Sequence, residues 1–146
     1  MPNVHTLELE GEHFGNSICL TVVKVFPNLK RLQIVGCKIT DLTPLEALHR
    51  LVGLNLFGSS VGDEQLQAIG NMSGLEDLCL HQTNVTEDGL KALFVLRNLV
   101  ALDVRGLGIE KESAADLRAN FQRRNLRISA GEYVAPPKDA LEEVLQ

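Results

Sequence analysis

Apolar residues recur along the chain in a fixed order that begins again every 22 to 25 residues. The order is apolar-x-x-apolar-x-apolar-x-x-small-x-apolar, and residues 29–39 fill every position of it. Five copies begin at residues 4, 29, 51, 75 and 99. Self-similarity at this period is typical of proteins in which each repeat stacks on its neighbours and buries a shared core.

The middle of each copy predicts a short strand. Positions four and six are apolar in all five copies, and because strand side chains alternate, both point toward the core. Glycine recurs at position eight, where the chain leaves the strand: Gly11, Gly36, Gly58 and Gly106. Helical spacing follows the strands in residues 14–26, 63–69, 86–96 and 110–122. A truncated sixth strand is expected around residues 125–128, where Leu126 fits either the first or the fourth position.

The pattern resembles the leucine-rich repeat family over residues 4–129. The 22-residue second copy, with Thr43-Pro44, is similar to the short repeats of internalins and of phosphatase-regulating proteins. The fourth copy, around Thr83, is more similar to the cysteine-containing class found in F-box proteins. The resemblance implies an α/β fold: a right-handed solenoid with a short parallel sheet on its concave side and helices on its convex side. It also implies that Cys37, Ser59 and Thr83, at position nine, turn inward and bond to backbone groups.

Two parts of the chain are expected. Residues 1–129 form the repeats, and residues 130–146 form a linker and a short amphipathic helix that caps the end of the stack; a tether or partner-binding helix is the alternative for that segment. The first strand, between Val4 and Leu9, begins close to Met1. We therefore expect either a preceding region or self-association at this edge, because an uncovered terminal repeat exposes a strand edge and apolar surface.

Positions three, five and seven point away from the core and form three rows across the sheet. Phe57, with Val35 beside it, is an aromatic side chain on an otherwise polar surface and is a candidate anchor for a partner. We take the partner-binding candidates on this concave face to be Glu8, Glu10, Arg31, Gln33, Val35, Asn55, Phe57, Asp77, Cys79, His81, Asp103 and Arg105.

Catalysis at this surface is not expected, nor is a cofactor or a metal site. Cys79 and His81 alternate along one strand, which separates their Cβ atoms by about 6.5–7 Å, too far for a nucleophile and its base. Paired Cys-x-x-Cys and His-x-x-x-His spacings do not occur in the sequence, and neither does a phosphate-binding glycine loop.

Composition narrows the class of partner. The net charge of −5 makes nucleic acid an unfavourable ligand, and the apolar runs are too short to predict membrane insertion. Three widely spaced cysteines favour a reducing, cytoplasmic location over a disulfide framework.

The sequence thus predicts a non-enzymatic scaffold that binds another protein on its concave face. One alternative is the substrate-recognition part of a ubiquitin ligase receptor, which would need an F-box or an equivalent helical segment. Another is a regulatory subunit associated with a phosphatase or with RNA.

Overall fold

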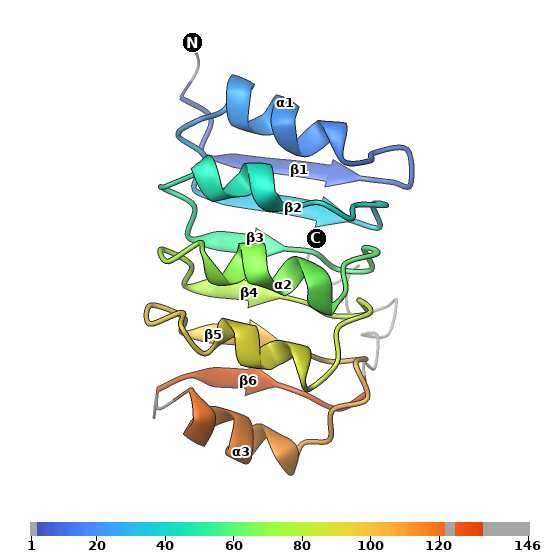
Figure 1. The fold of residues 1–146 in the computed structure, drawn as a ribbon, viewed down its shortest axis with the longest axis vertical. Helices are drawn as coiled ribbons and strands as arrows, with labels where there is room; N and C mark the ends of the chain where they lie inside the picture. The colour runs from blue at the N-terminus through green and yellow to red at the C-terminus, as the bar shows by residue number, and fades with distance from the viewer. Residues whose placement is uncertain (1–2, 122–124, 133–146) are drawn as a thin grey trace, which may run out of the picture.

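The computed structural model describes residues 3–121 and 125–132, and in them the chain forms one six-stranded parallel sheet (Figure 1). The strands are neighbours in the sheet in the order in which they occur in the sequence. They are β1 (Thr6–Glu10), β2 (Arg31–Val35), β3 (Gly53–Asn55), β4 (Asp77–Cys79), β5 (Ala101–Asp103) and β6 (Arg127–Ser129). The expected capping helix in residues 138–146 lies outside the described residues.

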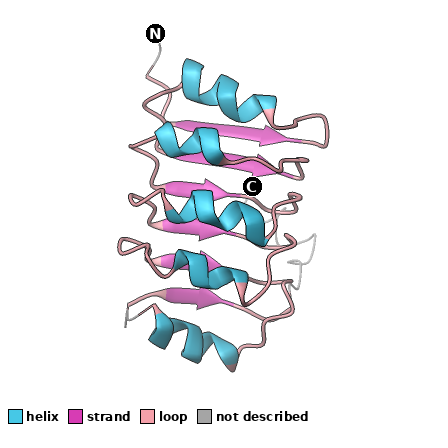
Figure 2. Cartoon of the chain, in the orientation of Figure 1, coloured by secondary structure: helices cyan, strands magenta, loops and turns pink. Residues whose placement is uncertain are grey.

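A helical segment follows each of the first five strands, and these segments cover one face of the sheet (Figure 2). Three are α-helices and two are short 3₁₀ helices: α1 (Ser17–Val25), η1 (Thr43–Ala47), α2 (Asp63–Gly70), η2 (Gly89–Leu93) and α3 (Ser113–Asn120). The helix expected over residues 63–69 is confirmed. The helices expected over 86–96 and 110–122 are shorter than predicted, because apolar spacing continues into the turns on either side of η2 and α3.

The core lies between the sheet and the helices, where the repeat pattern places it. The residues at positions four and six of copies two to five are at most 3% exposed. They are Leu32, Ile34, Leu54, Leu56, Leu78, Leu80, Leu102 and Val104. Leu7 and Leu9, at the same positions of β1, are only partly buried and pack against this core from one side.

The parallel register confirms the alignment of the first five copies. Thr6 on β1 pairs with Arg31, and the row continues through one residue of each strand as far as Arg127 on β6. Ile128 pairs with Leu102, so it occupies position four of a sixth copy. The sequence allowed Leu126 at position one or position four, and both assignments are wrong. Leu126 is at position two of the sixth copy, and it is nevertheless buried.

The chain leaves each of the first five strands through a residue with positive φ. Gly11, Gly36, Gly58 and Gly106 have φ between 63° and 118°, a region that side-chain-bearing residues rarely adopt. The fourth copy has Gln82 here, at φ 53°. At position nine, Cys37 is buried and bonds to backbone carbonyls as expected. Ser59 is buried too, but the expected backbone bond is wrong, because its hydroxyl has no hydrogen-bond partner among the described residues. Thr83 is only half-buried, and its hydroxyl donates a hydrogen bond to the carbonyl of Leu80.

Candidate functional site

A groove of about 490 Å³ crosses the sheet on the face opposite the helices, which we call the open sheet face. Its lining comes mainly from positions three and five of the six strands. The residues that line it at these positions are Thr6, Arg31, Gln33, Gly53, Asn55, Asp77, Cys79, Ala101, Asp103, Arg127 and Ser129. Parallel pairing thus brings together residues that lie more than 120 positions apart in the sequence.

Half of the residues predicted for this face line the groove: Arg31, Gln33, Asn55, Asp77, Cys79 and Asp103. The other half do not line it. Glu8 is at position five of β1, and Glu10, Val35, Phe57, His81 and Arg105 are at position seven of their repeats.

The predicted set omits five residues that line the groove at positions three and five: Thr6, Gly53, Ala101, Arg127 and Ser129. Arg127 and Ser129 were missed because the sixth strand had no fixed register. Placing Ile128 at position four would have found them, since position three is then Arg127 and position five is Ser129.

An ion pair crosses the middle of the groove. Nη1 of Arg31 lies 3.1 Å from Oδ2 of Asp77, although β3 separates their two strands. The pair forms because β3 has Gly53 at the intervening position: a Cβ there would come within 2.8 Å of Arg31 Nη1. The absence of a side chain at residue 53 therefore determines where the Arg31 guanidinium lies.

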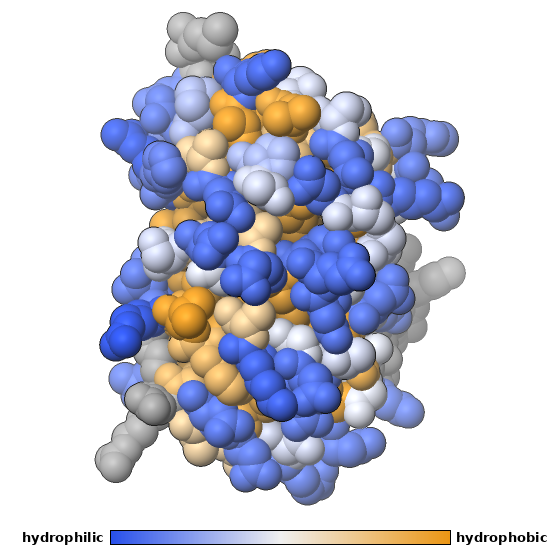
Figure 3. All heavy atoms as spheres, in the orientation of Figure 1, coloured by the Kyte–Doolittle hydropathy of each residue, from blue (hydrophilic) through white to orange (hydrophobic). Residues whose placement is uncertain are grey.

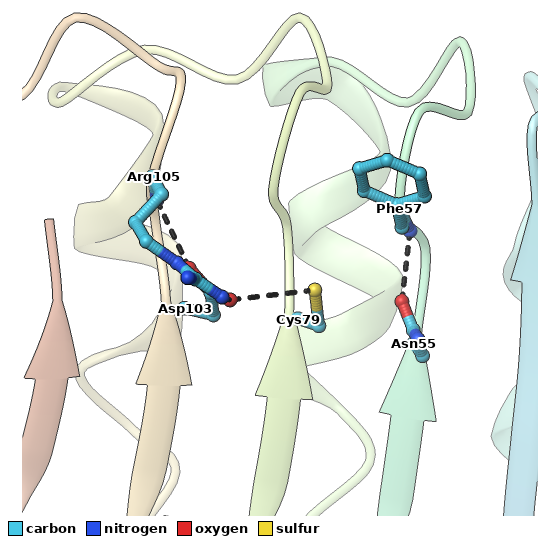
Figure 4. A network of polar contacts seen from close by, with 5 residues as sticks. All are labelled: Asn55, Phe57, Cys79, Asp103 and Arg105. Carbon is cyan, nitrogen blue, oxygen red and sulfur yellow. Dashed lines mark hydrogen bonds and ion pairs between the residues drawn. The ribbon is translucent and has the colours of Figure 1, made fainter. Parts of the chain in front are cut away.

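Side chains at position five hold the backbone at the end of their strands. The carboxamide oxygen of Asn55 accepts a hydrogen bond from the N–H of Phe57 at 2.9 Å (Figure 4). The Asn55 amide group donates a hydrogen bond to the side-chain oxygen of Gln33. Asp103 similarly accepts from the N–H of Arg105 and also from its guanidinium. These bonds fix the side chains in place without any ligand.

The Asp103–Arg105 pair determines the charge state of this part of the face. Burial acts to raise the pKa of Asp103, but the hydrogen bonds and positive charge of Arg105 outweigh it and hold the pKa below its usual value. Asp103 is therefore ionised at neutral pH.

Cys79 lies next to this pair but is not activated by it. Its Sγ is 3.9 Å from Oδ2 of Asp103 (Figure 4). Burial raises the pKa of the Cys79 thiol, and the negative charge of Asp103 acts in the same direction. A reactive cysteine needs a lowered pKa, because the thiolate is the nucleophile. The surroundings of Cys79 therefore favour the neutral thiol and not the thiolate that a nucleophilic cysteine needs.

The expectation that His81 projects into solvent is wrong. It is only 3% exposed. Its ring is packed between Phe57 from the preceding repeat, with ring centroids 4.8 Å apart, and the chain at Gly106 in the next repeat, where a Cβ would lie 3.3 Å from His81 Cδ2. Burial lowers the pKa of His81, which favours the neutral imidazole. Phe57 is half-buried and is therefore the more exposed member of this aromatic pair.

The described part of the chain contains neither a metal-binding cluster nor a membrane-spanning helix. Within residues 3–121 and 125–132, no three His, Cys, Asp or Glu side chains are placed to hold a metal ion. In the same residues, no helix combines the length and the apolar composition that crossing a bilayer requires.

The helix-bearing face differs from the open sheet face. Hydrophilic residues cover most of it, and hydrophobic residues lie in separate patches (Figure 3). The most exposed large apolar side chains of the described residues are Leu20, Val25, Val95 and Val100. They do not line the groove.

Comparison with known proteins supports the assignment of the fold. Neither a scan against models of protein families nor a search of curated proteins finds a match. Among solved structures, internalin C2 from Listeria monocytogenes matches at 26% identity with a TM-score of 0.60, over 90% of this chain and 49% of that one. A second internalin from the same strain matches at 18% identity with a TM-score of 0.44, over 75% of this chain and 36% of that one.

The chain therefore has an α/β fold like that of leucine-rich repeat proteins. It is similar to internalin C2 over nearly its whole length and spans about half the length of that protein.

Proposed function

We propose that this chain is a non-enzymatic protein–protein interaction module, a scaffold that binds another protein on its open sheet face. The observation that carries the proposal is the groove of about 490 Å³, which runs across all six strands and is lined by polar side chains together with Leu32, Leu54, Leu78 and Leu102. Many of these side chains already hold one another through Arg31–Asp77, Asn55–Gln33 and the contact of Cys79 with Asp103. A surface ordered before binding loses less side-chain entropy when a partner arrives.

The aromatic pair beside the groove supports the same function. Phe57 packs on buried His81, and its backbone N–H donates a hydrogen bond to the carboxamide of Asn55, so its ring is held at the surface. Aromatic side chains that are fixed in this way are frequent energetic centres of protein interfaces. We propose Phe57 as the apolar anchor of the interface, with the polar groove next to it.

Three finer properties belong to this proposal. The strand order and the one-sided helices favour a right-handed leucine-rich repeat solenoid whose open sheet face is concave. The repeats are of mixed kind, internalin-like in the second copy and cysteine-containing in the fourth. The three cysteines are all free thiols, which fits a cytoplasmic protein.

Blocking the groove tests the proposal. Ala101 is a small, partly exposed residue of the groove, so Ala101→Tyr fills the groove without entering the core. Val95, 64% exposed and outside the groove, offers the matched control Val95→Tyr. In affinity purifications with the native protein and both variants, a concave-face partner should bind the native protein and Val95→Tyr but not Ala101→Tyr. If every retained protein binds both variants equally, the open sheet face is not the binding surface.

A further inference from the structure

Charged side chains on the open sheet face are paired in the middle and single at the two ends. In the middle, Arg31 pairs with Asp77, and Arg105 with Asp103, so these four residues carry no net charge. At the two ends, charged side chains are unpaired: within the described residues, the exposed side chains of Glu8, Glu10 and Arg127 have no ion-pair partner.

The two ends carry opposite signs. Glu8 and Glu10 both lie on β1, the first strand of the sheet, and Arg127 lies on β6, the last. Five inter-strand spacings of about 4.8 Å separate these strands, which amounts to roughly 24 Å. The face is therefore negative at one end, neutral in the middle and positive at the other end.

A ligand that meets both ends has to be long. An extended peptide advances about 3.3 Å per residue, so roughly seven residues span the distance from β1 to β6. A small molecule confined to one part of the groove would meet charges of only one sign. A nucleic acid that spanned all six strands would place phosphates against Glu8 and Glu10 at the β1 end, and this repulsion would oppose its binding there.

We infer that the groove takes an extended protein segment with basic side chains at one end and an acidic group about seven residues away. The segment crosses the strands with its acidic end over Arg127, and its basic end extends beyond the groove lining at Thr6 to Glu8 and Glu10 on the same strand. Its central residues are uncharged and lie over Gln33, Asn55 and Cys79. This inference rests on the proposed function and specifies its ligand.

The single charges also fix the orientation of the segment. Reversed, the segment would place its basic residues over Arg127 and its acidic group over the two carboxylates. Like charges that face each other across an interface are unfavourable, and they therefore disfavour this orientation. The ion pairs in the middle contribute no such preference, because each is already neutral.

Peptide selection tests this inference and does not require the natural partner to be identified. The probe is a displayed library of random peptides of about twelve residues, longer than the groove requires. Selection is carried out on the native protein, on Glu8→Lys with Glu10→Lys, and on Arg127→Glu. Controls with the same change in net charge are Glu64→Lys with Glu87→Lys, and Arg97→Glu. All three control positions are exposed and lie outside the groove.

The native protein should select peptides with basic residues and an acidic residue about seven positions apart. Peptides selected on the Glu8→Lys with Glu10→Lys variant should lack the basic residues but keep the acidic one. Peptides selected on Arg127→Glu should keep the basic residues but lack the acidic one. A synthetic peptide selected on the native protein should bind each charge-reversal variant (Glu8→Lys with Glu10→Lys, and Arg127→Glu) at least about tenfold more weakly, since attraction becomes repulsion. It should bind the two control variants with unchanged affinity.

Two contrary results have different meanings. If selected peptides are blocked by Ala101→Tyr but bind both charge-reversal variants normally, the inferred charge pattern is wrong and the groove remains the binding site. If selected peptides are not blocked by Ala101→Tyr, they bind elsewhere, and the inference and the proposed function both fail.

Discussion

Gln82 is the one position-eight residue of the first five repeats that is not glycine, and replacing it should stabilise the protein. Its φ is 53°, in the left-handed region, where the other four repeats have Gly11, Gly36, Gly58 and Gly106. In this conformation the Cβ of an ordinary residue lies too close to the neighbouring carbonyl oxygen. Gln82→Gly removes that Cβ and leaves the backbone path unchanged.

The expected gain follows from two opposing contributions. The left-handed conformation costs a residue with a side chain about 1–2 kcal/mol. Glycine adds unfolded-state freedom that destabilises the folded protein by about 0.4–1 kcal/mol. The exposed Gln82 side chain lies on the chain at Gly106, a contact too small to change the balance. The free energy of unfolding should therefore rise by about 0.5–1 kcal/mol, which raises Tm by about 1–4 °C for a chain of this size.

Urea denaturation followed by circular dichroism measures this change, and two further variants isolate its cause. Gln82→Ala keeps a Cβ and should change the free energy of unfolding by less than about 0.5 kcal/mol. Gly58→Ala is the reciprocal change: the new Cβ would approach no atom closer than 3.9 Å, so only the φ of 63° is unfavourable. It should lower stability by about 1 kcal/mol. If Gln82→Gly lowers the urea midpoint, or if Gln82→Ala raises it equally, backbone strain at residue 82 is not the cause.

Three other expectations follow from the site. His81→Ala should reduce the free energy of unfolding by about 2 kcal/mol in a urea titration, because it removes a buried ring; an unchanged midpoint would contradict the packing against Phe57. In thiol labelling, Cys37 should react only on unfolding, whereas half-buried Cys79 should react in the folded protein, though more slowly than a free thiol, since burial raises the pKa of both. Asp103 has a lowered pKa in the folded protein, so its stabilising contribution is present above the unfolded value of about 3.9 and is lost as pH falls through the folded value. Asp103→Asn should remove this part of the acid dependence of stability, and an identical profile would contradict it.

The repeat period was the most informative part of the sequence. Positions four and six carry leucine, isoleucine or valine in every full copy, and a one-residue shift would turn all of them toward solvent. Register was therefore predictable for β1 to β5, and the outward rows followed from it. The helical segments were less predictable, since η2 is a short 3₁₀ helix in a stretch where Leu90, Leu93 and Phe94 have the spacing of a longer helix.

Alternation could not predict which outward side chains stay exposed. It correctly placed His81 on the open sheet face, but whether a side chain there is buried depends on its neighbours in the adjacent strands. His81 is covered because Phe57 stands on one side of it and a glycine, Gly106, lets the chain approach on the other. Whether a side chain on this face is exposed therefore depends on its own repeat and on the repeats before and after it. The sequence of one repeat does not determine it.

The same dependence on neighbouring repeats produces the charge pattern of the face. Arg31 reaches Asp77 because glycine at residue 53 leaves its path open, and this pairing removes two charges from the middle of the groove. A Cβ at residue 53 would come within 2.8 Å of Arg31 Nη1 and would displace the guanidinium from its present position. Gly53→Ser should therefore weaken the Arg31–Asp77 ion pair. The middle of the face would then carry two unpaired charges that a bound partner could contact.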